Sequence, residues 1–344
     1  MKAFRMTAWQ SQPEFREVEI REPGPGEVLV KIGGAGLCHS DLHIMEYPAG
    51  ALPYELPFTL GHENAGWVER VGAGVDGYAP GDPVIVYSVW GCGRCPQCRV
   101  GAENYCEAAP LFYGCGLGYD GGLAKHLLVP SARFLLPLEG LDPRQAAPLT
   151  DAGLTTYHAV RRSLALLHPG STAVVIGVGG LGQMAVQMLK ALSPARVIAI
   201  DVSAEKLTQA KALGADATLT SDERAAEHVR DLTHGAGAEL VLDVVGSDST
   251  LQLAVAVSRR LGHLTMVGIA GGTLPFSYMG VPNELSVASV FYGSIPELSE
   301  VVTLAREGKI KTQVELFALE QAPQAYQRLH DGSIRGRAVI TPNG

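Results

Sequence analysis

The sequence has no apolar stretch that approaches the roughly 18 residues needed for a membrane-spanning helix. Its first ten residues, MKAFRMTAWQ, also lack the apolar segment of a secretory signal peptide. Together these two absences predict a cytoplasmic protein with no membrane partner.

Clusters of basic residues are missing as well. Adjacent arginines occur only as the pairs Arg161–Arg162 and Arg259–Arg260. Lys and Arg total 27 against 35 Asp and Glu, which gives a formal net charge of −8. An acidic surface does not attract nucleic acid or anionic membranes. The charge therefore predicts that neither nucleic acid nor an anionic membrane is a partner.

At 344 residues the chain is too long for one ordinary domain, and its 47% of hydrophobic residues can fill two cores. Up to about residue 130 it consists of short extended segments, such as 27–32 and 82–87, that begin at Pro-Gly or Gly-Asp steps. This pattern predicts a small β-rich domain with long functional loops.

Beyond about residue 155 the pattern changes to alternating strands and helices. The run 172–176 is continuously apolar, as expected of a strand buried on both faces. Strand–helix alternation predicts an α/β fold with a parallel, doubly wound sheet. The expected strands are 172–176, 196–200, 240–242 and 264–267. One expected helix starts at residue 181, and a second covers 205–213.

The tail contains one helix-like segment at 298–306 and ends in Arg337-Ala-Val-Ile340. It is too short to be a domain, so we expect it to return to the first domain. The predicted division is therefore 1–153 with 291–344 for the β-rich domain, and 154–290 for the doubly wound domain.

A glycine-rich segment, Gly177-Val-Gly-Gly-Leu-Gly182, matches the pattern G-x-G-x-x-G. The pattern is weak by itself in a chain with 41 glycines, but here it joins a buried strand to an amphipathic helix. In that context the first glycine permits a tight turn, the second lets the backbone approach a pyrophosphate, and the third allows close packing. The alternative is a turn that binds nothing. The predicted cofactor-binding residues are Gly177, Gly179, Gly180, Leu181 and Gly182.

Asp201 ends the next strand, 19 residues after Gly182. A carboxylate there can bond the ribose 2′-OH and repel a 2′-phosphate, so it selects NAD over NADP. Val202 and Ser203 follow, and neither can receive a phosphate as an arginine does. The alternative is that Asp201 caps the following helix.

Four of the six cysteines lie in a loop at 91–107 with the spacing C-x2-C-x2-C-x7-C. Two-residue gaps place thiolates at the separations that tetrahedral Zn²⁺ requires. Four thiolates complete the coordination shell, so the predicted zinc is structural and stabilises a loop with little core of its own. An iron–sulfur cluster is the alternative, but its usual cysteine run ends in Cys-Pro with different gaps. The predicted ligands are Cys92, Cys95, Cys98 and Cys106.

Two further segments carry a family resemblance. Gly61-His-Glu-x-x-Gly66-x5-Gly72-x-x-Val75 resembles the signature of zinc-containing medium-chain alcohol dehydrogenases. Cys38-His-Ser-Asp-Leu-His43 resembles the stretch around the first catalytic zinc ligand of that family. With the cysteine loop and the glycine loop in the expected order, the resemblance extends from about residue 24 to the C-terminus. It implies a GroES-like catalytic domain and a Rossmann NAD-binding domain.

The resemblance implies that Cys38 and His62 bind the catalytic zinc, but the chain departs from many members at the third ligand. Asp151 stands where those members have a cysteine. A carboxylate also carries one negative charge and binds zinc at about 2.0–2.2 Å, which leaves a fourth position for a substrate oxygen. The surrounding segment 148–155 resembles a bacterial subset of the family that acts on secondary alcohols and aryl ketones. The alternative for Asp151 is a helix N-cap or a supporting group.

The implied reaction is hydride transfer between an alcohol and NAD(H), with zinc polarising the substrate oxygen. By resemblance, Ser40 takes the alcohol proton and passes it through the cofactor ribose to His43, which exchanges it with solvent. Asp41 orients a zinc ligand, and Glu63 supports the zinc or binds it transiently. His39 and Arg337 resemble the residues that contact the pyrophosphate, with Arg335 as the alternative to Arg337. A solvated loop histidine is the alternative for His39 and His43.

Substrate residues are less clearly marked. Tyr54, Trp90 and Tyr292 fall in segments that line the substrate pocket in relatives, and they favour a medium-sized apolar or aryl substrate. Core packing is the alternative for each. Cys115 has no assigned partner, and we expect a buried, inert thiol. The resemblance also implies a homodimer or homotetramer built through the nucleotide-binding domains.

Two other functions compete with this one. A polyol or amino-alcohol dehydrogenase needs several polar groups in its pocket, and the sequence offers mainly aromatic ones. A non-catalytic module that keeps NAD as a redox sensor needs neither an open metal position nor a proton relay. The sequence therefore predicts an NAD(H) oxidoreductase with two zinc ions per chain that interconverts alcohols, in particular secondary ones, with ketones or aldehydes.

Overall fold

The computed structural model describes residues 1–110 and 113–344. The described chain forms two compact units: unit 1 consists of Met1–Asp151, Ser294–Glu307 and Thr312–Gly344, and unit 2 of Ala152–Gly293 and Gly308–Lys311. The predicted divisions after residues 153 and 290 lie within a few residues of these bounds. The sequence did not suggest that Gly308–Lys311 belongs with unit 2. Within the described part of the chain, no helix is long and apolar enough to cross a membrane.

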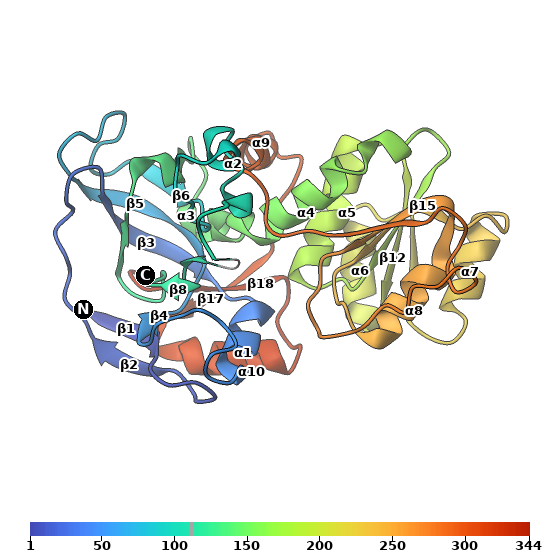
Figure 1. Ribbon diagram of the computed structural model, residues 1–344, viewed down its shortest axis with the longest axis horizontal. Helices are drawn as coiled ribbons and strands as arrows, with labels where there is room; N and C mark the ends of the chain where they lie inside the picture. The colour runs from blue at the N-terminus through green and yellow to red at the C-terminus, as the bar shows by residue number, and fades with distance from the viewer. Residues whose placement is uncertain (111–112) are drawn as a thin grey trace. The chain divides into compact units, whose positions relative to one another are not determined.

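Unit 1 is built mainly on antiparallel strands (Figure 1). Its largest sheet has the order β10-β6-β5-β3-β18-β17, with β9 also paired to β3, and a smaller sheet has the order β2-β1-β4. The strands are β1 (Lys2–Met6), β2 (Glu14–Glu17), β3 (Val28–Gly36), β4 (Phe58–Thr59), β5 (Glu63–Val71), β6 (Pro83–Val86), β7 (Gly114–Cys115), β8 (Gly118–Tyr119), β9 (His126–Val129), β10 (Leu135–Pro137), β17 (Val314–Ala318) and β18 (Arg337–Thr341).

Strand β3 brings distant parts of the sequence together. Its central position in the sheet follows from its composition, because eight of its nine residues are buried and many are β-branched or small. Gly36 at its end is paired with Glu63 of β5 on one side and with Val339 of β18 on the other. The C-terminal tail therefore lies in the same sheet as the N-terminal segment (Figure 1).

The helices of unit 1 are short and lie in its connections. The first of them, α1, begins immediately after Cys38, and Asp41 in its first turn accepts a hydrogen bond from the Cys38 backbone N–H. This cap fixes the position at which the helix begins, next to the end of β3. The helices are α1 (His39–Glu46), α2 (Pro96–Arg99), η1 (Glu103–Tyr105), η2 (Ala132–Phe134), α3 (Pro143–Ala146), η3 (Ala147–Thr150), α9 (Ile295–Arg306), η5 (Leu319–Gln321) and α10 (Ala322–His330).

Unit 2 contains a parallel sheet with the order β13-β12-β11-β14-β15-β16. In order of sequence this is 3-2-1-4-5-6, so the connections reverse direction between β11 and β14, where doubly wound sheets bind nucleotides. The strands are β11 (Thr172–Ile176), β12 (Arg196–Asp201), β13 (Ala217–Thr220), β14 (Ala238–Asp243), β15 (Ser258–Met266) and β16 (Ser286–Ser289). The predicted α/β fold class with a parallel, doubly wound sheet is confirmed.

Helices flank this sheet (Figure 1). The core contains Val174, Ile176, Ile198, Ile200 and Val241 from the central strands, with helical residues packed against them. Each such buried side chain contributes about 1.5–3 kcal/mol of transfer free energy. The helices of unit 2 are α4 (Ala152–Arg161), η4 (Leu164–Leu166), α5 (Gly180–Leu192), α6 (Ala204–Ala212), α7 (Ala225–Leu232) and α8 (Asp248–Val257).

Candidate active site

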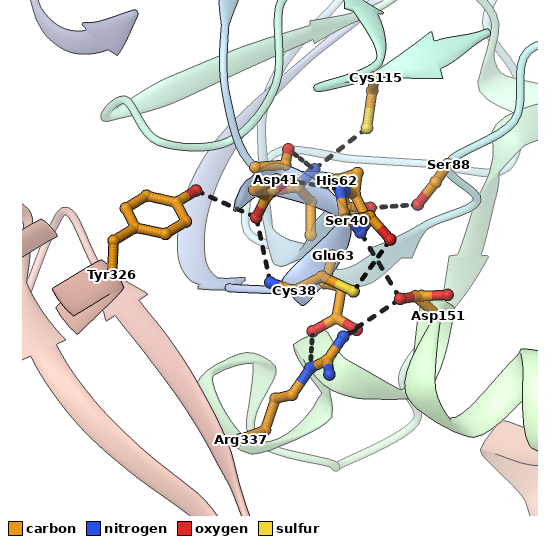
Figure 2. A network of polar contacts seen from close by, with 12 residues as sticks. Cys38, Ser40, Asp41, His62, Glu63, Ser88, Cys115, Asp151, Tyr326 and Arg337 are labelled. Carbon is orange, nitrogen blue, oxygen red and sulfur yellow. Dashed lines mark hydrogen bonds and ion pairs between the residues drawn. The ribbon is translucent and has the colours of Figure 1, made fainter. Parts of the chain in front are cut away.

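Three side chains that are distant in sequence meet in unit 1: Cys38 before α1, His62 before β5 and Asp151 after η3 (Figure 2). One ligand atom from each lies within 4.8 Å of the others, and all three residues are buried. His62 Nε2 is 3.5 Å from Asp151 Oδ2. The structure thus brings together the three residues that the sequence suggested as one metal site.

The spacing of these donors suits zinc. Nitrogen and oxygen ligands of tetrahedral Zn²⁺, at about 2.0–2.2 Å from the ion, lie about 3.3–3.6 Å from each other. The 3.5 Å between His62 Nε2 and Asp151 Oδ2 falls within this range. A thiolate and a carboxylate would balance the two charges of the ion, and three protein ligands leave one position open, as in catalytic zinc sites.

The carboxylate of Asp41 lies next to the His62 ring. Its Oδ1 lies 3.0 Å from His62 Nδ1, while its Oδ2 accepts hydrogen bonds from the Cys38 N–H and from the Tyr326 O–H, each over 3.0 Å. Ser88 holds the same histidine by donating to its backbone carbonyl (Figure 2). With Nδ1 directed at Asp41, His62 presents Nε2 to the metal position, as metal-binding histidines with a carboxylate partner do.

Tyr326 was missed from the sequence. It comes from α10, 285 residues after Asp41, and is buried in unit 1. Burial and the neighbouring Asp41 hold the pKa of its hydroxyl well above the ordinary value, so it remains a hydrogen-bond donor. No local pattern around Tyr326 marks it as part of the site.

Glu63 and Arg337 form a buried ion pair beside the three ligands. Arg337 Nε donates to Glu63 Oε2 over 2.9 Å, and its Nη2 bonds both Glu63 Oε1 and, over 3.1 Å, Asp151 Oδ2. Burial raises the pKa of Glu63 to about 7, and the Arg337 guanidinium opposes this rise. Gly36 makes room for the pair, because a Cβ there would lie 1.9 Å from Glu63 Oε2. Arg337 therefore contacts carboxylates of the site, and its predicted contact with the pyrophosphate stays a prediction.

Helix α1 carries the residues of the predicted proton relay. Ser40 Oγ accepts a hydrogen bond from the Cys38 thiol over 3.4 Å, and Ser40 and His43 are both half-buried. A separation of three residues places Ser40 and His43 on neighbouring parts of one helical face. His39 is exposed at the start of the helix. This geometry is compatible with the predicted roles of all three residues, which remain predictions.

The cysteine lobe, residues 91–107, forms a second candidate metal centre in unit 1. The four thiol sulfurs lie within 4.8 Å of one another, and Cys92 Sγ is 4.0 Å from Cys98 Sγ. Zn–S bonds of about 2.3 Å place tetrahedral sulfurs about 3.8 Å apart, whereas a multi-iron cluster needs more space between its thiolates. Backbone N–H groups of Arg94 and Cys95 lower the pKa of Cys92 to about 6, which favours a thiolate, whereas burial raises the pKa of Cys98. The set fits a closed, four-thiolate zinc site.

Cys115 belongs to neither cluster. It is fully buried and accepts a hydrogen bond from Asn64 Nδ2 over 3.1 Å, while the same amide bonds the carbonyl of Gly61. Burial raises the pKa of its thiol to about 12. A buried, unreactive thiol agrees with the interpretation from sequence.

The three predicted substrate residues do not all lie in one unit. Tyr54 is buried in unit 1, and Trp90, also in unit 1, lines a cavity of about 530 Å³ with Tyr119 and Phe134. Cys38, His62 and Asp151 do not line this cavity. Tyr292 belongs to unit 2, where its ring packs edge-on against Phe291 at 5.0 Å. Their place in a substrate pocket stays a prediction.

The glycine loop of unit 2 connects β11 to α5, and its glycines have different roles. Gly177 has a φ of +89°, which glycine adopts without strain. A Cβ at Gly182 would lie 1.9 Å from the carbonyl oxygen of Gly177, so this position must be small for the helix to pack on the loop. Gly179, the N-cap of α5, has open space where its Cβ would be. That opening, at a helix N-terminus, is where a pyrophosphate can approach the backbone.

Asp201 ends β12 next to this loop. Its Oδ2 accepts the Val178 N–H over 2.6 Å, and its Oδ1 accepts the Ser203 N–H over 2.9 Å. Ser203, not Asp201, is the N-cap of α6. The helix-cap alternative for Asp201 is therefore wrong, and the carboxylate is held at the end of the strand where a ribose hydroxyl is expected.

Comparison with known families gives two matches. Residues 24–140 match the model of the alcohol dehydrogenase GroES-like domain, and residues 180–307 match that of the zinc-binding dehydrogenases. The first match falls in unit 1 and the second mainly in unit 2.

Individual relatives match over almost the whole chain. An NAD-dependent alcohol dehydrogenase of Sulfurisphaera tokodaii is 38% identical over 99% of this chain and 100% of its own. The crystal structure of the alcohol dehydrogenase of Aeropyrum pernix is similar with a TM-score of 0.92, at 38% identity, and covers 99% and 100% of the two chains. The acetophenone reductase of Geotrichum candidum in complex with NAD is similar with a TM-score of 0.86, at 32% identity, and covers 99% and 96%.

Proposed function

This chain belongs to the zinc-dependent alcohol dehydrogenase family, and from that premise we propose that it interconverts secondary alcohols and ketones by hydride transfer with NAD(H). The observation that carries the proposal is the buried Cys38–His62–Asp151 set, whose donors fit zinc and leave one position open. The cofactors are NAD(H) and two zinc ions, one at this set and one in the cysteine lobe.

Zinc at the open site supplies a Lewis acid that polarises the oxygen of an alcohol or ketone. Cys38, His62 and Asp151 hold it, and Asp41 keeps His62 in the tautomer that presents Nε2. Ser40, on the first turn of α1, would accept the alcohol proton, and His43 on the same helix would take it on towards solvent. His43 is half-buried, so it can release the proton to solvent.

NAD is the proposed partner of the glycine loop in unit 2. Gly177, Gly179, Gly180, Leu181 and Gly182 form the turn and the start of α5 at which a pyrophosphate binds. Asp201 selects NAD, since its fixed carboxylate can bond the ribose 2′-OH and repels a 2′-phosphate. His39 and Arg337 are proposed to contact the pyrophosphate.

Asp151 as the third ligand supports the narrower assignment to a bacterial type that acts on secondary alcohols and aryl ketones. The similar acetophenone reductase supports the same substrate class. The proposed pocket residues Tyr54, Trp90 and Tyr292 are aromatic and suit a medium-chain or aryl substituent. We place the enzyme in the cytoplasm, as expected from the sequence.

The assembly is proposed to be a homodimer or homotetramer built through unit 2. One segment of that unit leaves large apolar side chains in solvent, namely Phe276, Tyr278 and Met279, which are 61%, 85% and 88% exposed. Apolar side chains gathered in this way mark interaction surfaces. Sedimentation of the purified chain tests the assignment, because a monomer at micromolar concentration would contradict it.

A panel of primary alcohols, secondary alcohols, polyols and ketones tests the function, with NADH absorbance as the signal. We expect the highest kcat/KM for secondary alcohols and for aryl or medium-chain ketones. A preference for polyols would instead support the polyol dehydrogenase alternative. Absence of turnover with every substrate, in protein that carries both zinc ions and binds NAD, would favour the redox-sensor alternative and refute the proposal.

A further inference from the structure

Arg133, in η2, connects the cysteine lobe to the rest of unit 1. Its guanidinium pairs with the carboxylate of Glu103, which is 1% exposed inside the lobe, and also donates to the carbonyl of Gly91. The lobe closes tightly at that point. A Cβ at Gly91 would lie 1.9 Å from Glu103 Oε2 and 2.7 Å from Cys98 Sγ. Arg133 thus holds both the acid that packs against Cys98 and the backbone that leads into Cys92.

The same guanidinium begins a series of stacked rings. Its Cζ lies 4.1 Å from the centre of the Phe134 ring, and Phe134 stacks on Trp90 at 6.1 Å. Trp90 contacts Tyr119 at 5.5 Å, Tyr119 contacts Tyr113 at 4.6 Å, and Tyr113 contacts Tyr54 at 5.9 Å. These distances are typical of cation–π and aromatic pairs that contribute to stability. We call the five rings, Phe134, Trp90, Tyr119, Tyr113 and Tyr54, the aromatic run.

The far end of the aromatic run is Tyr54, which is buried in unit 1, as His62 is. Burial raises the pKa of Tyr54, and the charge of His62 opposes this rise. Gly118 allows this end to pack, because a Cβ there would be 2.8 Å from both the Tyr54 and the Tyr113 ring. A displacement of Trp90 can therefore be transmitted through ring contacts to the Tyr54 side chain.

Trp90 is the point at which the lobe and the aromatic run meet. It directly precedes Gly91 and Cys92, and its indole Nε1 donates to the carbonyl of Tyr87 over 3.0 Å. Only Gly91 separates Trp90 from the proposed zinc ligand Cys92, while the Trp90 ring is stacked on Phe134. Arg133 contacts both sides of this junction, the Gly91 carbonyl and the Phe134 ring.

We propose that Arg133 is a positioning residue that couples the metal in the cysteine lobe to the placement of Trp90 and, through the aromatic run, of Tyr54. The planar guanidinium suits this role because it can bond Glu103 and Gly91 through separate N–H groups while its face lies over an aromatic ring. A lysine at the same position can keep only part of these contacts. The consequence for substrate affinity rests on the proposed function, whereas the coupling between the lobe and Trp90 does not.

The test compares Arg133→Ala and Arg133→Lys with wild type, with Arg94→Ala as the matched control. Arg94 is an exposed arginine of the same lobe. The release of zinc to a chelator is measured over time. The kinetic phase that is absent in Cys106→Ser is assigned to the zinc of the cysteine lobe. Tryptophan emission is recorded in parallel, and its Trp90 component is assigned by difference from Trp90→Phe. Finally, KM is measured for an aryl ketone, a short aliphatic ketone and NADH.

For Arg133→Ala we expect lobe zinc to be released about tenfold faster or more, as for other residues that support metal ligands. We also expect the Trp90 emission to shift and KM for the aryl ketone to rise roughly two- to tenfold, the worth of an aromatic contact. KM for NADH stays as in wild type. Arg133→Lys gives intermediate values, and Arg94→Ala matches wild type.

Wild-type zinc release in Arg133→Ala would overturn the proposal, and so would faster release with an unchanged Trp90 emission. If Arg133→Ala does not fold, Glu103→Gln removes the charge of the partner at constant shape and should change both signals in the same direction by less. If the wild-type protein turns over no alcohol or ketone, the proposed function fails. Zinc release and Trp90 emission then still decide on the role of Arg133.

Discussion

Arg337 donates a hydrogen bond from Nη2 to Oδ2 of Asp151 over 3.1 Å, and this same oxygen faces His62 Nε2 at 3.5 Å. A carboxylate oxygen has two lone pairs, so it can accept from an arginine and still serve a metal. The contact therefore helps to hold the side chain of the proposed third ligand, and Figure 2 shows Arg337 and His62 converging on the same Asp151 oxygen. Glu63 balances the charge of Arg337, and the three residues form one buried network.

Replacement of Arg337 tests this network. Arg337→Met leaves the Glu63 carboxylate buried without its cation, and we expect it to lower the free energy of unfolding by about 3–5 kcal/mol. The double variant Arg337→Met/Glu63→Gln removes both charges and should recover a large part of that loss. Urea denaturation of the wild type, Arg337→Met, Glu63→Gln and the double variant measures the effect. If the double variant is as unstable as the sum of the two single variants, the two side chains are not coupled.

Tyr326 is expected to support catalysis through Asp41. Tyr326→Phe keeps the ring but removes the hydrogen bond to Asp41 Oδ2, which should destabilise the orientation of His62. Partners of metal-binding histidines typically contribute about 10–100-fold to metal affinity or activity, so a fall in kcat of about tenfold is expected. Zinc affinity and kcat are measured together. A variant with wild-type values for both would show that Asp41 needs only His62 and Cys38.

Asp201 should determine the cofactor preference. Asp201→Gly removes the carboxylate that can bond a ribose hydroxyl and repel a 2′-phosphate, so the ratio of kcat/KM for NADH over NADPH should fall. Asp201→Asn is the control, because it removes the charge but keeps an oxygen that can accept the Val178 N–H. Initial rates with both cofactors measure the ratio. An unchanged ratio in Asp201→Gly would refute the assignment.

The sequence could predict those parts of the molecule that local spacing encodes. The cysteine lobe follows from two-residue gaps, and the glycine loop follows from its place between a buried strand and a helix. Cys38, His62 and Asp151 carry no such spacing, and only the family resemblance suggested that they meet. The structure explains how they do so, since the end of β3, the start of β5 and the end of η3 lie at the same place.

Contacts between residues far apart in the chain could not be predicted. Tyr326 reaches Asp41 across 285 residues, and Arg133 reaches Glu103 across 30, with no pattern around either residue to indicate a partner. The same limit applies to Arg337, for which the sequence suggested a phosphate contact but not the carboxylates that it binds in unit 1. Such pairings depend on sheet register, as in the alignment of Gly36 with both Glu63 and Val339, which composition does not specify.

The central claim is that Asp151 is the third ligand of the catalytic zinc. It is tested most directly by zinc content and activity of Asp151→Ala, with circular dichroism to show that the fold is retained and Asp151→Cys as the control that restores a ligand. The account predicts two zinc ions per chain in the wild type, one in Asp151→Ala together with loss of activity, and recovery of the second ion in Asp151→Cys. An Asp151→Ala protein that keeps both ions and full activity would contradict it.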